Sequence, residues 1–386
     1  MNSTQTHSRD TYVAGVGIHE FGRFEKTFEE IGKEAVVEAL DDAQMSIHDM
    51  EAGFCGKTYL PTSTGVRVLK EIGLTGIPVP DIDAACAAGA SGLSTATAMV
   101  EAGAIDVALA FGVEKMPRGF MDPTNIYPDW MCHMGLSQNP QYWAMSAKRH
   151  MYDHGTTKEQ IADVAAKNHQ HSELNPNAYY TDPMDREEVL DSPLVCDPLN
   201  QFSICAPNDG AAAAVICSGE VVEERGIDGA VELLTATHRT ATFPFPRGGT
   251  FCASPTGNRS TTKMAADAAY EEAGIGPDDV SLAEVQDTNA FGELLCYEQL
   301  GFCDPGKGGE FIDSGAPWRD GELPVNVSGG LISKGEPPGA SHIGQVHELV
   351  LQLRGDAGDR QIDDPSVGLA HVLGAMGQCG ITILRG

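Results

Sequence analysis

The sequence predicts an α/β protein, built from layers of strands and helices. Apolar runs of strand length alternate with segments of helical periodicity along most of the chain. The run from Ile105 to Met116 is apolar nearly throughout, which is typical of a strand that helices cover on both faces of its sheet. With 386 residues, 41% of them hydrophobic, the chain can bury a large core in two or more domains or in one two-lobed unit.

The spacing of hydrophobic residues and the positions of turn residues predict a succession of strands and helices along the chain. In the first helical segment, Ile31, Ala35 and Leu40 fall on one apolar side. The N-terminal part is expected to contain strands at 11–21, 52–59, 77–83, 105–116 and 209–217, and helices at 28–43, 65–72 and 87–101. The C-terminal part is expected to contain strands at 231–240, 282–287, 325–330, 367–376 and 379–384, and helices at 261–273, 291–300 and 340–353. The pattern therefore repeats, and residues 1–225 and 226–386 are expected to form two similar halves.

Residues 117–200 interrupt this alternation within the first half. The segment is rich in Pro, Met, Tyr, Trp and His, and it contains helical patterns at 142–154 and 158–172. The second of these follows Thr156-Thr157, a helix start signal. A long insertion between core strands usually has a function, and this composition suits an apolar ligand. We therefore expect a loop or lid that forms part of a binding tunnel, or alternatively a contact between subunits.

The chain is strongly acidic, with 55 acidic residues against 25 basic ones and a net charge of −30. This charge argues against nucleic acid and anionic membranes as partners. The ten cysteines lack the paired spacing of a zinc site, so we expect free thiols in a reducing cytoplasm. A polar start and the absence of an apolar run of membrane-spanning length predict neither a signal peptide nor a membrane span.

Cys86 lies where an expected strand becomes an expected helix. Residues 77–83 have strand character, and the run of small residues from Ala87 has helical composition. Unpaired N–H groups at a helix N-terminus favour an anion and so stabilise a thiolate. Neighbouring Ala and Gly residues leave room for a substrate. The alternative is a small buried cysteine in a close-packed helix.

The order of several short motifs resembles the thiolase superfamily, in particular its sterol-carrier-protein thiolase and lipid-transfer-protein branch. The motifs cover nearly the whole chain: Ala85-Cys86-Ala87-Ala88-Gly89, Gly112-Val-Glu-Lys-Met116, Ala165-Ala-Lys-Asn-His169, Cys205-Ala-Pro-Asn-Asp-Gly-Ala-Ala-Ala213, Glu284-Val-Gln-Asp-Thr288, Asn326 to Gly339, and His371-Val-Leu-Gly-Ala-Met-Gly377. The resemblance implies a thiolase fold, in which two similar five-stranded βαβαβαββ halves give a five-layered α-β-α-β-α core with a loop-domain insertion. It also implies a dimer.

The resemblance implies an acylated cysteine at Cys86, but most other catalytic positions of the family pattern differ. Glu336 stands where the family has its activating histidine, and Gln286 stands where it has the histidine before Asp287. Thr288 replaces a cysteine of the sterol-carrier branch, and His371 stands at an alternative proton-shuttle position. The predicted catalytic residues are Cys86, Glu336, His371, Gln286 and Asp287, and the predicted substrate-binding residues are Thr288, Asn289, Gly377, Met131 and His133.

These differences change the chemistry that the site can perform. A carboxylate at Glu336 would raise the pKa of Cys86 by like-charge repulsion. In an apolar pocket, Glu336 would itself have a raised pKa and could serve as a general acid or base. Gln286 could still donate an N–H to a thioester oxygen. The alternatives are a solvated loop carboxylate for Glu336 and a hydrogen-bonded core histidine for His371.

Three functions stay open at this stage. The first is retro-aldol cleavage of a β-hydroxyacyl-CoA, since the superfamily includes aldolases that act on steroid side-chain thioesters and also lack the thiolase histidines. The second is a β-ketoacyl-CoA thiolase, or acetyl-CoA C-acyltransferase, with Cys86 as nucleophile. The third is a non-catalytic carrier of lipids or acyl-CoA.

Coenzyme A is expected only as the thioester of substrate and product, with no bound cofactor. No metal is expected, because His342 and His347 are poorly spaced as metal ligands and no third ligand is evident near them in the sequence. The resemblance further implies a small OB-fold acyl-CoA-binding partner, sometimes beside a hydratase.

Overall fold

The strands form a sheet with two parts that meet along one short pairing. The computed structural model describes residues 9–119, 124, 129–135, 137–242 and 260–386. In spatial order, the first part contains β3 (Asp81–Ile82), β2 (Ala52–Gly56), β4 (Val107–Glu114), β7 (Asp209–Ser218) and β1 (Thr11–Gly22). The second contains β8 (Val231–Thr240), β11 (Gln378–Arg385), β10 (Val367–Gly374) and β9 (Leu282–Glu284). Only Tyr12 and Val13 of β1 pair with β8, so the two parts act as separate layers.

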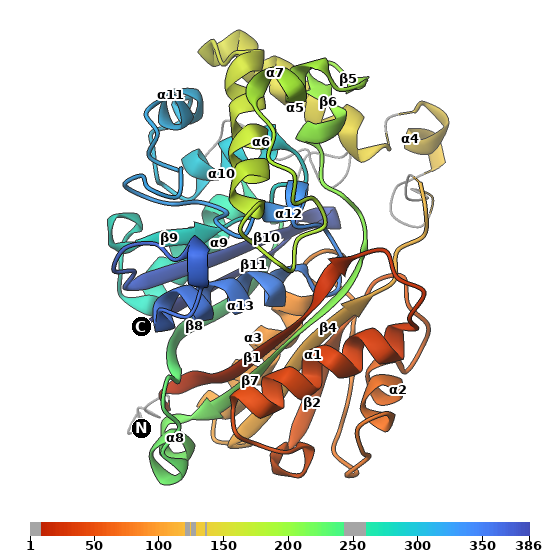
Figure 1. Ribbon diagram of the computed structural model, residues 1–386, viewed down its shortest axis with the longest axis vertical. Coiled ribbons are helices and arrows are strands. Elements are labelled where there is room, and N and C mark those ends of the chain that lie inside the picture. Colours follow the sequence, from red (N-terminus) through yellow and green to blue (C-terminus); the bar gives the residue numbers. More distant parts are fainter. Residues whose placement is uncertain (1–8, 120–123, 125–128, 136, 243–259) are drawn as a thin grey trace.

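Helices cover both sheet layers and fill the space between them (Figure 1). Helices α3 (Ala88–Glu101) and α13 (Ser341–Arg354) contact strands of both parts and form the central layer. One outer face carries α1 (Phe28–Asp42), α2 (Thr64–Lys70) and α8 (Gly219–Arg225). The other carries α9 (Thr261–Ala273), against which α10 (Ala290–Gln299) packs. The five-layered arrangement expected from the sequence is thus confirmed.

Two expected strands are much shorter than predicted. The strand expected at 77–83 is reduced to the two residues of β3, because Pro78 and Pro80 have no N–H to donate and serve only as acceptors for β2. The strand expected at 325–330 is a single bridge between Ala283 and Val325. The chain then turns at Asn326, whose φ is +56° and whose side chain accepts the N–H of Val285.

Close backbone contacts bring the segment after Glu336 onto the first sheet. A Cβ added to Gly112 on β4 would lie 2.0 Å from the carbonyl oxygen of Gly339, and one added to Gly56 on β2 would lie 2.8 Å from it. Only glycine leaves room for this approach. The two halves of the chain therefore meet at the carboxyl ends of β2 and β4.

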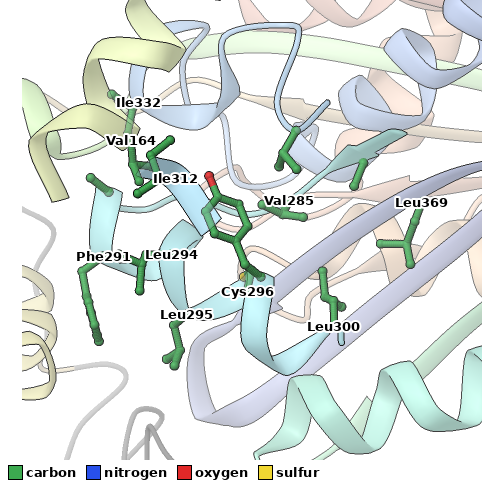
Figure 2. Close-up of a cluster of buried hydrophobic side chains, with 14 of the residues drawn as sticks. Val164, Val285, Phe291, Leu294, Leu295, Cys296, Leu300, Ile312, Ile332 and Leu369 are labelled. Atoms are coloured by element: carbon green, nitrogen blue, oxygen red, sulfur yellow. The ribbon is translucent and has the colours of Figure 1, made fainter. Parts of the chain in front are cut away.

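The insertion packs as a helical layer on the second half. It contains α4 (Asp129–His133), α5 (Asn139–His154), α6 (Lys158–Ser172), α7 (Arg186–Asp191), β5 (Leu194–Cys196) and β6 (Leu199–Asn200). Helix α6 has the predicted bounds and begins with a capping box between Thr157 and Gln160. It contacts α10, α11 (Gly308–Asp313) and α12 (Gly330–Ser333). Figure 2 shows the shared core, in which Val164, Ile312 and Ile332 lie near Leu294.

Candidate active site

Cys86 lies in a tight turn directly before α3. The preceding residue, Ala85, has a φ of +51°, and the N–H groups of Ala87 and Ala88 close the turn on the carbonyls of Ala84 and Ala85. A left-handed φ is costly for alanine, so packing around the turn must hold it. The Cys86 side chain is partly exposed and lines a cavity. Its position at the start of the helix is the one that the sequence suggested.

Glu336 reaches the same cavity from the C-terminal half. A strand-like bridge joins it to Pro207, and its N–H donates to the carbonyl of Ala206 at 2.9 Å. The N–H of Asn208 donates in turn to the Glu336 carbonyl at 3.4 Å. The residue is only 5% exposed, which excludes a solvated loop carboxylate.

Neutral donors surround the Glu336 carboxylate. The Nε2 group of Gln286 donates to its Oε1 at 3.2 Å, and the thiols of Cys86 and Cys205 also hydrogen-bond to it. Burial raises the pKa of Glu336 above its ordinary value, and the three hydrogen bonds lower it in part. Burial, followed by the charge of Glu336, raises the pKa of Cys86 well above its ordinary value. The expected stabilisation of a thiolate by the helix terminus is therefore outweighed, because desolvation and a nearby carboxylate both disfavour the anion.

Gln286 and His371 are held by polar neighbours. The Oε1 atom of Gln286 accepts the N–H of Leu373, which turns its amide nitrogen toward Glu336. His371 Nε2 lies 3.1 Å from Thr262 Oγ1, and its Nδ1 lies 3.6 Å from the sulfur of Cys296. Burial lowers the pKa of His371 to about 3, so the ring is neutral at physiological pH. His371 is thus a hydrogen-bonded buried histidine that also lines the cavity.

Asp287 points away from these groups. Its carboxylate accepts the N–H of Leu331 at 2.6 Å and of Ile332 at 3.1 Å, at the start of α12. Asn168 Nδ2 donates to it at 2.8 Å. These contacts place Asp287 in a buried polar network behind the cavity wall, where it supports α12.

The cavity has a volume of about 310 Å³ and a largely apolar lining. Its apolar walls include Tyr59, Trp143, Ile204 and Leu295. The polar groups that line it are Thr58, Cys86, Ser137, Gln138, Asn139, Cys205, Thr262, Gln286, Thr288, Asn289, Cys296, Gln299, Glu336 and His371. A cavity of this size and character suits a small apolar ligand with one reactive polar end.

The five predicted substrate-binding residues separate into two groups. Thr288 and Asn289 line the cavity, although Asn289 also caps α10 by accepting the N–H of Gly292 at 3.0 Å. Met131, His133 and Gly377 are not among its lining residues. Met131 is buried within α4 and His133 is exposed on the same helix, while the Gly377 carbonyl accepts the N–H of Ala241.

Among the cavity residues that the sequence did not indicate, Cys205, Thr262 and Cys296 contact the candidate catalytic groups Glu336 and His371. Cys205 begins a motif that was recognised only as a family landmark. Cys296 has a weak signal, because Gly292, Leu295 and Cys296 follow helical spacing on one face of α10. Thr262 has none, since its contact with His371 joins residues 109 positions apart.

Among the described residues, no group of three or more His, Cys, Asp or Glu side chains could hold a metal ion. Within that same part of the chain, no helix is long and apolar enough to cross a membrane. The cysteines that the structure describes form no disulfide bonds.

Comparison with known proteins agrees with the fold described above. One family model, described as the thiolase N-terminal domain, matches residues 18–220, and another, described as thiolase C-terminal domain-like, matches residues 251–386. The chain belongs to the thiolase family. It is 34% identical over 391 residues to sterol carrier protein 2 of Rattus norvegicus, which covers 97% of this chain and 71% of that protein. This similarity assigns it to the sterol-carrier-protein thiolase and lipid-transfer-protein branch.

One further similarity bears on the general activity, and another bears on the fold. The chain is 34% identical over 389 residues to an acetyl-CoA acetyltransferase of Methanothermobacter thermautotrophicus, covering 96% of this chain and 97% of that enzyme. A solved structure named the Ltp2-ChsH2(DUF35) aldolase shares the fold, with a TM-score of 0.84, 23% identity and 98% coverage of both chains. The protein is therefore of the thiolase-fold acyl-CoA enzyme or lipid-transfer kind.

Proposed function

We propose that this protein cleaves a β-hydroxyacyl-CoA by a retro-aldol reaction, with a steroid or other lipid side chain as the acyl group. The observation that carries the proposal is the position of Glu336 in the cavity, hydrogen-bonded to Cys86, Cys205 and Gln286. A buried carboxylate with a raised pKa is suited to accept and return a proton near neutral pH. Its neighbour Cys86 is held as a thiol, which is a weak nucleophile.

The proposed reaction needs one base and one stabilised enolate. Glu336 takes the proton of the β-hydroxyl group, and the electron pair of that O–H bond forms the carbonyl of one product. The bond between the α and β carbons breaks, and its electrons move into the thioester as an enolate. Protonated Glu336 then returns the proton to the α carbon, so no acyl-enzyme forms.

Gln286 is placed to stabilise that enolate. One N–H of its amide donates to Glu336, and its oxygen is held by Leu373. The other N–H can donate to the thioester oxygen as negative charge develops there. Coenzyme A takes part as the thioester of substrate and product.

A second candidate function is thiolysis of a β-ketoacyl-CoA. The observation that favours it is the thiol of Cys86, which faces the cavity at the start of α3 and is close to a carboxylate that could accept its proton. Such a reaction requires a thiolate and an acyl group on Cys86 during turnover. The apolar lining would also suit the third candidate, a carrier that binds acyl-CoA without reaction.

We also propose that the chain works as a homodimer with a small OB-fold acyl-CoA-binding protein and an associated hydratase. The solved structure named the Ltp2-ChsH2(DUF35) aldolase carries two protein names, and this supports a partner for the present chain. The low number of basic residues, 25 in all, agrees with a partner that holds the phosphates of coenzyme A. Full activity and full affinity for coenzyme A in the purified homodimer would contradict the need for a partner.

The deciding experiment compares two variants on two substrates. On a β-hydroxyacyl-CoA, Glu336→Gln should lose about 10²–10⁴-fold in kcat/KM, the usual contribution of a general base. Cys86→Ala should retain most of the activity, because the thiol forms no covalent bond to the substrate and is one of three donors to Glu336. Thiolysis is assayed in parallel with a β-ketoacyl-CoA plus coenzyme A.

The thiolase function predicts the reverse result. Cys86→Ala would then be inactive, and mass spectrometry would find an acyl group on Cys86 after incubation with a β-ketoacyl-CoA. Detection of that adduct as a turnover intermediate would overturn the retro-aldol proposal. Tight binding of both substrates without turnover of either would identify a carrier.

A further inference from the structure

Glu114 is a fully buried carboxylate at the end of β4, behind the wall of the cavity. It accepts the backbone N–H of Thr58 at 2.8 Å and of Tyr59 at 3.0 Å. The backbone N–H groups of Gly339 and Lys115 also donate to it. The Glu114 side chain thus binds three separate segments. Thr58 and Tyr59 follow β2, Lys115 follows β4, and Gly339 precedes α13.

Each of these segments leads to a group at the cavity. Thr58 and Tyr59 line the cavity directly, and the Thr58 hydroxyl donates to the carbonyl of Ala85 at 3.2 Å. Ala85 is the left-handed residue that precedes Cys86. Gly339 lies three residues after Glu336 and packs on the glycines of β2 and β4. Glu114 therefore stands where the Cys86 turn and the Glu336 segment are joined.

We propose that Glu114 is a positioning residue, whose ionised carboxylate holds the Thr58–Tyr59 wall, the Cys86 turn and the Glu336 segment in one arrangement. It does not line the cavity and acts through its backbone contacts. This role of Glu114 rests on the proposed function for the measurement of kcat. The NMR titration described below does not depend on which reaction the cavity performs.

The chemistry of the contacts makes the arrangement depend on the charge of Glu114. All four neighbours are N–H donors, so an ionised carboxylate can satisfy them together. A protonated carboxyl group is itself a donor and must lose at least one of these contacts. Burial raises the pKa of Glu114 to about 7, which brings the change into the physiological range.

The other titratable groups that face Glu114 do not change charge in that range. Burial raises the pKa of Cys55 on β2 and of Tyr59, so both stay neutral. The Lys115 ammonium group is directed elsewhere, to the carbonyl of Phe24 and the carboxylate of Asp209. The pH dependence of the contacts with Thr58 and Tyr59 is thus assigned to Glu114 itself, separately from the proton exchange of Glu336.

The first test is Glu114→Gln, which keeps the shape but cannot accept four donors. For a group of pKa 7, the ionised fraction falls about tenfold from pH 8 to pH 6. We expect the variant to show about tenfold lower kcat than the wild type at pH 8, similar kcat at pH 6, and a smaller change in KM. The step in kcat centred near pH 7 that comes from Glu114 should be absent in the variant, which keeps only the acidic limb set by Glu336.

A matched control is available on the same strand. Glu51 accepts the backbone N–H groups of Asp106 and Val107 at the opposite end of β4, at 2.8 and 3.1 Å. Glu51→Gln should leave the pH profile of kcat unchanged. Thr58→Val removes the hydroxyl contact with Ala85 but keeps the N–H contact with Glu114. It should lower kcat at every pH without moving the midpoint.

The second measurement does not depend on which reaction the cavity performs. In protein labelled with [5-¹³C]glutamate, one carboxyl resonance should titrate near pH 7 and be missing in Glu114→Gln. Amide signals of Thr58 and Tyr59 should shift with the same midpoint. A folded Glu114→Gln variant with the wild-type pH profile, or the absence of such a resonance in the wild type, would overturn the inference. A missing retro-aldol activity with this titration intact would instead overturn only the proposed function.

Discussion

The protein buries two polar clusters that differ in how their charges are paired. In the network behind the cavity, the Lys167 ammonium group lies 2.8 Å from the Glu293 carboxylate, and both side chains are fully buried. Tyr297 and Asn326 donate to the same carboxylate at 2.6 and 2.8 Å. At the cavity, the Glu336 carboxyl group has only thiols and an amide as neighbours.

The difference indicates which cluster is structural and which is reactive. The buried ion pair of Lys167 and Glu293 has further hydrogen-bond donors around its carboxylate, and it joins α6 to α10. A carboxyl group with only neutral donors has no cation to hold its charge, so its pKa is raised and it changes protonation readily. Asp287 belongs to the first cluster, because its carboxylate accepts the N–H groups of Leu331, Ile332 and Asn168 behind the cavity wall.

The largest change in stability is expected from Lys167→Met, a substitution in the ion-paired network. It leaves the Glu293 carboxylate buried without a cation, which typically costs about 3–5 kcal/mol of unfolding free energy. Urea denaturation measures the loss. The double variant Lys167→Met/Glu293→Gln should recover part of it, because no unpaired charge remains. A loss below about 1 kcal/mol in the single variant would show that the network is not the structural cluster.

A change of opposite sign is expected at the cavity. Because the pKa of Glu336 is raised in the folded protein, its ionisation costs stability as the pH rises above the ordinary glutamate value of 4.5. Glu336→Gln removes this cost, so the variant should gain about 1 kcal/mol at pH 8 and less at pH 5. Thermal unfolding at both pH values measures the gain. A destabilised variant at pH 8 would place Glu336 with the structural cluster.

The thiol donors can be tested through the pH profile. The hydrogen bond from Cys205 lowers the pKa of Glu336, so Cys205→Ala should raise that pKa and move the acidic limb of kcat/KM to higher pH by roughly one unit. Cys205→Ser, which keeps a donor, is the matched variant and should move it less. An unchanged limb in Cys205→Ala would exclude a contact between the thiol and the ionised carboxylate.

The smallest effect is expected outside both clusters. Thr27 caps α1 and forms a capping box with Glu30, through hydrogen bonds of 3.3 and 2.8 Å. Thr27→Ala should cost about 1 kcal/mol of unfolding free energy and leave kcat unchanged. This variant calibrates the stability scale of the other tests. A change in its pH profile would show that general destabilisation, and not the buried clusters, controls the activity.

Much of the fold could be predicted because its elements carry local signals. The bounds of α6, α9 and β8 agree with the prediction, since apolar period and start residues act within a few positions. The prediction was too long at β3 and at 325–330, where Pro78, Pro80 and a left-handed Asn326 interrupt the ladder. The short helix α12 was missed because its N-terminus is supported by Asp287, a partner more than 40 residues away.

The sequence by itself determined the layered α/β class, the family order of motifs and the substitution of a carboxylate at position 336. These features depend on local composition and spacing, which a linear chain displays directly. Only the tertiary structure decided that Glu336 lies against Cys86 and Cys205, that Asp287 supports a helix, and that Glu114 joins the segments behind the cavity. Those relationships depend on burial and on hydrogen bonds between distant residues, and burial is what sets the pKa of each carboxyl group.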